Sequence, residues 1–310
     1  MSRHVKFGVR MHQHGYDFDD LKRVWTQADR LGYHSATLYD LLNAPALECW
    51  TALSALAALT ERIRLTPLVL GNAYRPPALL AKMSATLDVI SGGRLELGIG
   101  AGGGKGDHRA SGLPFPSTAE RVRMLEEAVE LIKRSWTEPN ATFQGRYYSL
   151  EESVNEPKPV QQPHPPVLIG GHGERHLLRS VAGHADICNI GFEMSLVEHQ
   201  SKMEILQRHC DELGRDPSGI EVTHNTRVVI AESQRQFEVL AAQGAASANV
   251  SLADYKKSLS GAIAGTPEQC YQQLSRYVDD GMHYFFLLFP DPISNESLDL
   301  FANEVMPHFA

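Results

Sequence analysis

The stretch Leu87-Asp88-Val89-Ile90-Ser91-Gly92-Gly93-Arg94-Leu95-Glu96-Leu97-Gly98-Ile99-Gly100 decides the fold, because it joins the two kinds of element that recur along the chain. Residues 77–90 are predicted to be a helix, with a proline near its start. The glycine pair at 92–93 makes a turn, and residues 95–99 then form a short apolar strand. A helix that is followed closely by a strand is the repeating unit of an alternating α/β protein.

The same alternation continues in both directions from this stretch. Short connections between strands and helices indicate a parallel sheet with crossover helices. Eight strand–helix units favour closure into a single (β/α)8 TIM barrel, with a doubly wound sheet as the main alternative. We expect one domain over residues 1–310, and we interpret residues 137–166 as an irregular insertion after the fourth helix, with a small hairpin inside it. The expected strands span residues 5–10, 35–39, 63–70, 95–99, 167–170, 186–190, 221–230 and 284–289.

Composition excludes several classes of function. The 310 residues carry a net charge of −8 and show no basic stripe, which argues against a nucleic-acid partner. The chain has no long apolar run and no apolar leader at its start, so we predict a cytoplasmic protein that does not enter membranes. Its four cysteines lie far apart without a CxxC pair, so neither a zinc site nor a redox dithiol is expected.

In a barrel of this kind the active site lies at the carboxyl ends of the strands. The fifth strand ends in Ile169-Gly170-Gly171-His172-Gly173-Glu174-Arg175. Glycines let backbone amides approach an anion closely, and a helix that starts here would present unpaired N–H groups to a phosphate. Arg175 could add a charge-assisted contact. The alternative is a glycine-rich turn that only connects the strand to the helix.

Other strand ends carry further candidates. The Gly98–Gly106 loop after the fourth strand could pack its backbone over a flat ring or a phosphate, or could be a surface loop. Its glycine spacing does not match a dinucleotide-binding fingerprint. Asp40, after the second strand, is either a catalytic or cofactor-binding carboxylate or a residue that initiates a turn. His12 and His14 follow the first strand, but no third ligand accompanies them, so no metal site is predicted.

Four segments together resemble the luciferase-like monooxygenase superfamily, and within it the oxidoreductases that depend on the deazaflavin coenzyme F420. The likeness extends from the first strand to the last helix, and the Ser-Gly-Gly-Arg turn followed by Leu-Gly-Ile-Gly is its most specific part. The segments are Thr60-Glu61-Arg62-Ile63-Arg64-Leu65, Tyr74-Arg75-Pro76-Pro77-Ala78-Leu79-Leu80-Ala81-Lys82, the opening stretch at 87–100, and Pro165-Pro166-Val167-Leu168-Ile169-Gly170-Gly171.

This resemblance implies a barrel that forms a homodimer and holds its cofactor at the carboxyl mouth. The ring would pack against the end of the third strand, where the family often has a non-prolyl cis peptide. The matching position lies near Thr66, Pro67 and Leu68, without a choice among its bonds. The loop at Gly100, Ala101 and Gly102 would form a second side. The cofactor phosphate would lie near Gly170, Gly171, His172, Gly173 and Arg175.

The sequence departs from the family at two positions. The family commonly ends its second strand with Asp-His, whereas this chain has Asp40-Leu41. Some relatives also place a glutamate in the loop after the fourth strand, where this chain has glycines at 102–104. The usual acid–base pair is therefore absent. Asp40, His12 and His14 are our catalytic candidates, and the wider set of replacements for the missing histidine adds Tyr39, Glu48 and His108.

Three hypotheses for function follow. The first is hydride transfer between F420 and a small organic substrate, with the cofactor carrying the redox chemistry. The second keeps the fold but uses FMN and oxygen, as in a flavin monooxygenase. The third is a cofactor-binding protein with little or no catalysis. The substrate itself cannot be named, because variable loops build the substrate pocket in such barrels.

Overall fold

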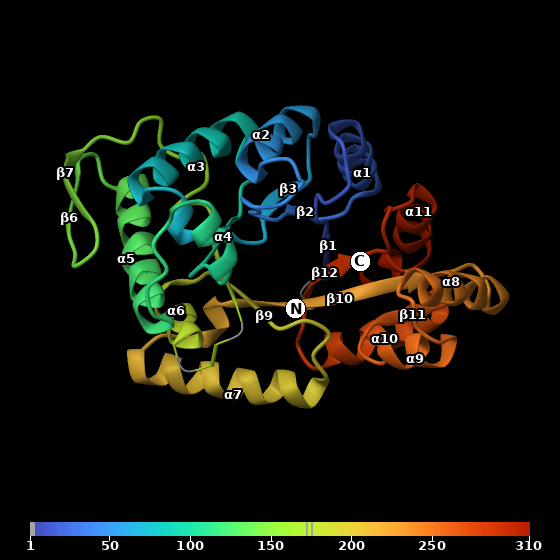
Figure 1. Ribbon diagram of the computed structural model, residues 1–310. Helices are drawn as coiled ribbons and strands as arrows, with labels where there is room; N and C mark the ends of the chain where they lie inside the picture. The colour runs from blue at the N-terminus through green and yellow to red at the C-terminus, as the bar shows by residue number, and fades with distance from the viewer. Residues whose placement is uncertain (1–3, 172, 175) are drawn as a thin grey trace.

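The computed structural model describes residues 4–171, 173, 174 and 176–310, and a ring of parallel strands lies at its centre (Figure 1). His172 and Arg175, two of the predicted cofactor residues, lie outside the described residues. Along the sheet the strands follow the order β3-β2-β1-β12-β10-β9-β8-β5-β4. The strands are β1 (Lys6–Val9), β2 (Ser35–Leu38), β3 (Arg64–Pro67), β4 (Leu70–Gly71), β5 (Leu97–Gly100), β8 (Val167–Gly171), β9 (Ile187–Ile190), β10 (Glu221–Ile230) and β12 (Tyr284–Leu288).

β3 and β4 lie at the two ends of this strand order and together form the third strand of the barrel, so the ring closes between them. A non-prolyl cis peptide at Leu68–Val69 separates the two halves. β4 pairs in parallel with β5, and Leu65 of β3 forms a bridge to Leu95, so both ends of the sheet meet at the same place. The predicted (β/α)8 TIM barrel is therefore confirmed. The cis bond follows Leu68, the last residue of the Thr66–Leu68 stretch that the resemblance pointed to.

Helices cover the outside of the ring. The first of them shows why they form: Asp17 caps its amino end, Gly32 ends it in the left-handed conformation, and Leu21 and Trp25 face the core. Within the described part of the chain, no helix is both long and apolar enough to cross a membrane. The helices that follow the barrel strands are α1 (Phe18–Leu31), α2 (Cys49–Leu59), α3 (Pro77–Ser91), α5 (Thr118–Thr137), α6 (Leu177–His184), α7 (Leu196–Leu213), α10 (Pro267–Asp279) and α11 (Asn295–Glu304).

Two excursions leave the alternating pattern. The expected insertion after the fourth helix contains the antiparallel hairpin of β6 (Ala141–Gln144) and β7 (Ser149–Ser153), which projects beyond α5 (Figure 1). The second excursion comprises α8 (Gln234–Ser247), α9 (Leu252–Ser258) and β11 (Ile263–Gly265). Gly244 lies inside α8, and the ring of Tyr255 from α9 packs so closely against it that a side chain would not fit there. Strand β11, which was not predicted, extends the far end of β10.

A buried polar network forms the floor of the barrel, at the amino ends of the strands. The Glu96 carboxylate accepts hydrogen bonds from Arg64 Nε at 2.7 Å, Thr66 Oγ1 at 2.8 Å and Tyr284 Oη at 2.8 Å. Burial opposes ionisation, but the hydrogen bond from His34 and the charge of Arg64 outweigh it and lower the pKa of Glu96 to about 2. The floor therefore holds an ionised carboxylate whose oxygens are occupied by donors from neighbouring strands.

Candidate active site

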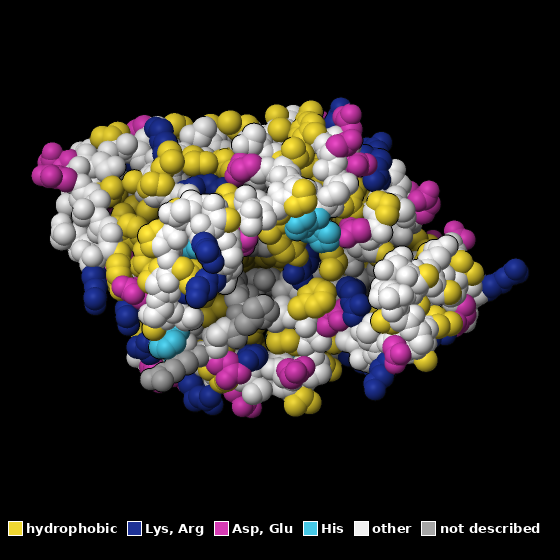
Figure 2. Space-filling model, in the orientation of Figure 1, with side chains coloured by type: hydrophobic (Ala, Val, Ile, Leu, Met, Phe, Trp, Pro, Cys, Tyr) yellow, Lys and Arg dark blue, Asp and Glu magenta, His cyan; other side chains and the backbone are white. Residues whose placement is uncertain are grey.

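A cavity of about 710 Å³ opens at the carboxyl ends of the strands. Strand ends from β1, β2, β4, β5, β8, β9 and β10 contribute to its wall, together with the loop that precedes α4 (Lys105–Ala110). Figure 2 shows a recess near the middle of this face, with hydrophobic side chains inside it and charged side chains distributed around it. The position agrees with the general placement of active sites in such barrels.

Most of the predicted cofactor residues that the structure describes come together in the wall of this cavity. Thr66 and Pro67 are exceptions: Thr66 donates its hydroxyl to Glu96 on the floor, and the carbonyl oxygen of Pro67 packs against Gly98. The predicted residues that line the cavity are Leu68, Gly100, Ala101, Gly102, Gly170, Gly171 and Gly173.

Glycines at the ends of β5 and β8 make room for the side chain of Val69. A Cβ atom on Gly100 would lie 2.8 Å from Val69 Cγ2 and 3.0 Å from the carbonyl oxygen of Gly170. A Cβ atom on Gly170 would lie 2.8 Å from Val69 Cγ1. The two 2.8 Å separations from Val69 are shorter than a real contact allows, so neither position accepts a side chain without movement of its neighbours. The cis bond at Leu68–Val69 and these glycines together build one smooth side of the cavity.

The glycine-rich loop at residues 100–104 is held in place from behind. Arg121 Nε donates to the carbonyl oxygen of Gly102 at 2.9 Å, and its guanidinium lies 4.0 Å from the centre of the Phe115 ring. The ring of His108 is buried beneath the same loop, with Nδ1 2.9 Å from the carbonyl oxygen of Gly104. The loop thus presents bare backbone to the cavity in a fixed position. That surface fits a flat ring or a phosphate.

Asp40 lies in the cavity wall with both carboxylate oxygens occupied. Oδ2 accepts from the Gly71 backbone amide at 2.9 Å and from Arg75 Nη1 at 2.7 Å, while Oδ1 accepts from Arg75 Nη2 at 2.9 Å. Arg75 also donates to Glu48, which caps the start of α2 through the amides of Trp50 and Thr51. Burial disfavours the Arg75 charge, but the hydrogen bond that Arg75 donates to Asp40 outweighs it and raises the Arg75 pKa. Asp40 consequently ties the end of β2 to β4.

The two predicted histidines lie outside the cavity lining. His12 Nε2 is 2.7 Å from Asp291 Oδ2, and the hydrogen bond to that carboxylate raises the His12 pKa. His14 is exposed, with its ring 5.7 Å from that of His12. Tyr39 does line the cavity. Across the part of the chain that the structure covers, no group of three or more His, Cys, Asp or Glu residues could hold a metal ion.

The cavity wall also contains polar residues that sequence reasoning missed, namely Arg10, Asn189 and Asn225. Asn189 donates to Thr223 Oγ1 at 2.6 Å, and Asn225 donates to the Gly191 carbonyl oxygen at 2.9 Å. Arg10 directly follows β1, Asn189 lies near the end of β9, and Asn225 lies inside the long strand β10. The strand-end rule that selected Asp40 could have found Arg10 and Asn189 as well.

Comparisons with known proteins agree with this geometry. The family model for luciferase-like monooxygenases matches residues 4–262. The chain is 38% identical over 161 residues to an FMNH(2)-dependent dimethylsulfone monooxygenase of Pseudomonas putida, covering 50% of this chain and 44% of that protein. It is 24% identical over 98% of both chains to an F420-dependent glucose-6-phosphate dehydrogenase of Amycolatopsis mediterranei. The solved coenzyme F420-dependent tetrahydromethanopterin reductase of Methanopyrus kandleri superposes with a TM-score of 0.81 at 19% identity, covering 99% of this chain and all of that one.

Proposed function

Because the chain belongs to the luciferase-like monooxygenase family, we propose that it is an oxidoreductase that transfers a hydride between coenzyme F420 and a small organic substrate. The observation that carries the proposal is the cavity wall made of Gly100, Gly170 and the Leu68–Val69 cis peptide. Such a wall offers a flat, side-chain-poor surface to a ring system. The choice of F420 is supported by the likeness to the Amycolatopsis enzyme, which extends over nearly the whole of both chains.

Each part of the cavity has a task in this proposal. Bound F420 would supply the hydride chemistry, while the protein supplies orientation and proton handling. Leu68 and Val69 would support the ring from one side. Backbone amides at Gly171 and Gly173, just before α6, would face the phosphate. The helix begins at Leu177, a few residues after these glycines.

A proton must reach the oxygen of a carbonyl that accepts a hydride. The Tyr39 hydroxyl lies in the cavity wall, and its oxygen accepts a hydrogen bond from Arg10 Nε at 2.6 Å, which leaves its own proton to be donated. Asp40, whose oxygens are engaged by Arg75 and Gly71, holds the wall in position. We therefore assign proton delivery to Tyr39, and we assign a positioning role to Asp40.

Turnover with and without oxygen tests the proposal. The purified protein is incubated anaerobically with F420 and a panel of small alcohols, and loss of the F420 absorbance is followed. We expect reduction of F420 by at least one alcohol, and a large loss of kcat in Tyr39→Phe with little change in F420 affinity. Tight binding of F420 without turnover of any donor would contradict the proposal and support a binding protein.

FMN is the second candidate cofactor, and the higher identity to the Pseudomonas putida monooxygenase over half of the chain favours it. In that case the protein would act on its substrate only with reduced FMN and oxygen. The same panel is therefore supplied with reduced FMN in air, and products are analysed by mass spectrometry. Oxygenated product here, together with no F420 reduction in the anaerobic assay, would overturn the first proposal.

A further inference from the structure

Arg10 follows β1 directly and enters the cavity wall between two aromatic rings. Its backbone amide continues the β1–β12 ladder by donating to the Leu287 carbonyl oxygen at 2.8 Å. The guanidinium carbon lies 4.7 Å from the centre of the Phe192 ring and 5.5 Å from that of Tyr39. Arginine stacks on aromatic faces in this way, which fixes the plane of its guanidinium. The side chain is therefore oriented before any ligand arrives.

The guanidinium of Arg10 is only partly satisfied. Nε donates to the Tyr39 hydroxyl, whereas Nη1 is enclosed by the protein and has no hydrogen-bond partner among the described residues. Arg121, the other described arginine that lines the cavity, differs because its three nitrogens donate to the carbonyl oxygens of Gly102 and Pro116 and to Thr118 Oγ1. Arg10 is half-buried and lines the cavity, so an oxygen atom that enters the cavity can approach its guanidinium, and pairing a polar group that lacks a partner lowers the free energy of the protein. Among the described arginines of the cavity, Arg10 is thus the one with a nitrogen that has no partner.

Three acidic side chains near the mouth are bound by groups other than Arg10, while a fourth, Asp107 on α4, lines the cavity. Asp40 is bound by Arg75, and Glu174 forms an ion pair with Lys202. Asp291 accepts from the Tyr16 hydroxyl at 2.5 Å and from His12. These carboxylates are therefore held by other donors rather than by the Arg10 guanidinium.

We propose that Arg10 forms a subsite for a carboxylate group on the substrate, so that the enzyme acts on small organic acids with an apolar body. This inference rests on the proposed function and narrows its substrate class. A carboxylate is favoured because its planar oxygen pair matches the fork of a guanidinium. The apolar part of such a molecule would face Leu41, Leu68 and Phe192, which line the same cavity.

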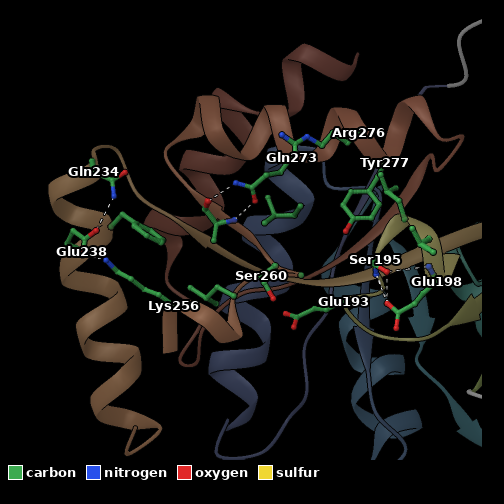
Figure 3. A pocket seen from close by; sticks show the side chains of 18 residues that line it. Glu193, Ser195, Glu198, Gln234, Glu238, Lys256, Ser260, Gln273, Arg276 and Tyr277 are labelled. Carbon is green, nitrogen blue, oxygen red and sulfur yellow. Dashed lines mark hydrogen bonds and ion pairs between the residues drawn. The ribbon is translucent and has the colours of Figure 1, made fainter. Parts of the chain in front are cut away.

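A second hollow of about 730 Å³ lies between α7, α8, α9 and α10, and its chemistry is different (Figure 3). There Glu238 pairs with Lys256, Ser195 bonds to Glu198, and Gln273 bonds to the backbone of Ala264. These polar groups are satisfied by one another, and the hollow lies among helices, away from the glycine-lined strand ends that would hold the cofactor. The barrel mouth is accordingly where we place the acid subsite.

Calorimetric titration with hexanoate and its neutral analogue hexanamide tests this subsite. The full chain is used with and without F420, as wild type and as Arg10→Gln, Arg10→Lys and the matched surface control Arg235→Gln. We expect the wild type and R235Q to bind hexanoate at least about tenfold more tightly than hexanamide, the effect of one charge-assisted hydrogen bond. R10Q should bind both compounds equally weakly, and R10K should keep part of the preference.

Equal binding of hexanoate and hexanamide by the wild type, or an unchanged hexanoate affinity in R10Q, would overturn the subsite. A loss of F420 affinity in R10Q as large as its loss of hexanoate affinity would also overturn it, since Arg10 would then serve the cofactor. Failure of the wild type to bind F420 concerns the proposed function alone, because hexanoate can still be titrated without cofactor. If circular dichroism shows that R10Q is unfolded, Arg10→Lys is the test variant, and an undiminished preference for hexanoate in that variant would count against the subsite.

Discussion

The floor and the mouth of the barrel differ in how completely their polar groups are hydrogen-bonded within the protein. At the floor, Glu96 accepts from Arg64, Thr66 and Tyr284, so that charge and hydrogen bonds are satisfied within the protein. At the mouth, the wall is mostly glycine backbone and apolar side chains, and one N–H group of Arg10 has no acceptor among the described residues. Glu96 directly precedes β5, and Gly100 is its last residue. The comparison shows that β5 can stabilise the fold at its amino end while its carboxyl end contributes to a binding surface.

The largest expected effect is on stability, from Glu96→Gln. Removing one member of a buried charged network leaves Arg64 without its ionic partner and should lower the free energy of unfolding by about 3 kcal/mol. Urea denaturation followed by circular dichroism measures it. The matched control is Glu221→Gln, which breaks a half-exposed pair with Lys6 at the same end of the barrel and should cost less than about 1 kcal/mol. Equal losses of unfolding free energy in the two variants would contradict the claim that the buried Glu96 network stabilises the protein more than a surface ion pair does.

Acid should weaken the floor in a defined pH range. The Glu96 pKa is about 2 in the folded protein and has an ordinary value of 4.5, so the folded state favours the ionised form. The resulting stability is complete above about pH 4.5 and is lost as the pH falls towards 2, by about 3 kcal/mol in total. Burial also lowers the pKa of His224, to about 4, which weakens the protein between pH 6.5 and 4.

The difference between wild type and Glu96→Gln isolates this acid effect. His224 titrates in both proteins, so its contribution cancels when their unfolding free energies are subtracted at each pH. We expect that difference to shrink as the pH is lowered from 4.5. A difference that stays constant down to the lowest pH at which both proteins fold would contradict an ionised Glu96.

A smaller effect is expected at the mouth from Asp40→Asn. The amide keeps an acceptor for the Gly71 backbone N–H, but it loses the charge that holds Arg75, so stability should fall by about 1 to 2 kcal/mol. F420 affinity should fall several-fold because the wall around β4 loosens. Glu48→Gln, which removes the more exposed partner of Arg75, should cost less than about 1 kcal/mol. Normal stability with abolished turnover in D40N would mean that Asp40 acts in the chemistry rather than in positioning.

The sequence predicted the barrel and most of the cavity wall because both follow local rules. The short-range periodicity of apolar residues predicts the alternation of strands and helices. Glycine-rich segments directly after strands indicate the residues that line the mouth. The position of the cis bond was not predictable in this way. Its place at Leu68–Val69 is coupled to the fit of Val69 against Gly98, Gly100 and Gly170, which belong to two other strands.

Arg10 was missed for a related reason. An arginine after a strand is unremarkable in sequence, and only the fold brings it between Tyr39 and Phe192, from the ends of two other strands. Thr66 was expected to contact the cofactor because it lies next to the predicted ring position in sequence. In the structure its hydroxyl instead donates to Glu96 on the floor of the barrel. Side chains alternate between the two faces of a strand, so a residue next to the predicted ring position need not point towards the cofactor.

The central claim is that the glycine wall around Val69 is the cofactor surface, and one titration tests it most directly. F420 is titrated into wild type, Gly100→Ala and Gly219→Ala, with quenching of F420 fluorescence as the readout. A Cβ atom at Gly219 meets nothing within 4 Å, whereas at Gly100 it would press on Val69 at 2.8 Å. The account predicts equal affinity for wild type and G219A and a loss of at least about tenfold in G100A. Equal affinity in all three proteins, or no binding of F420 by the wild type, would contradict it.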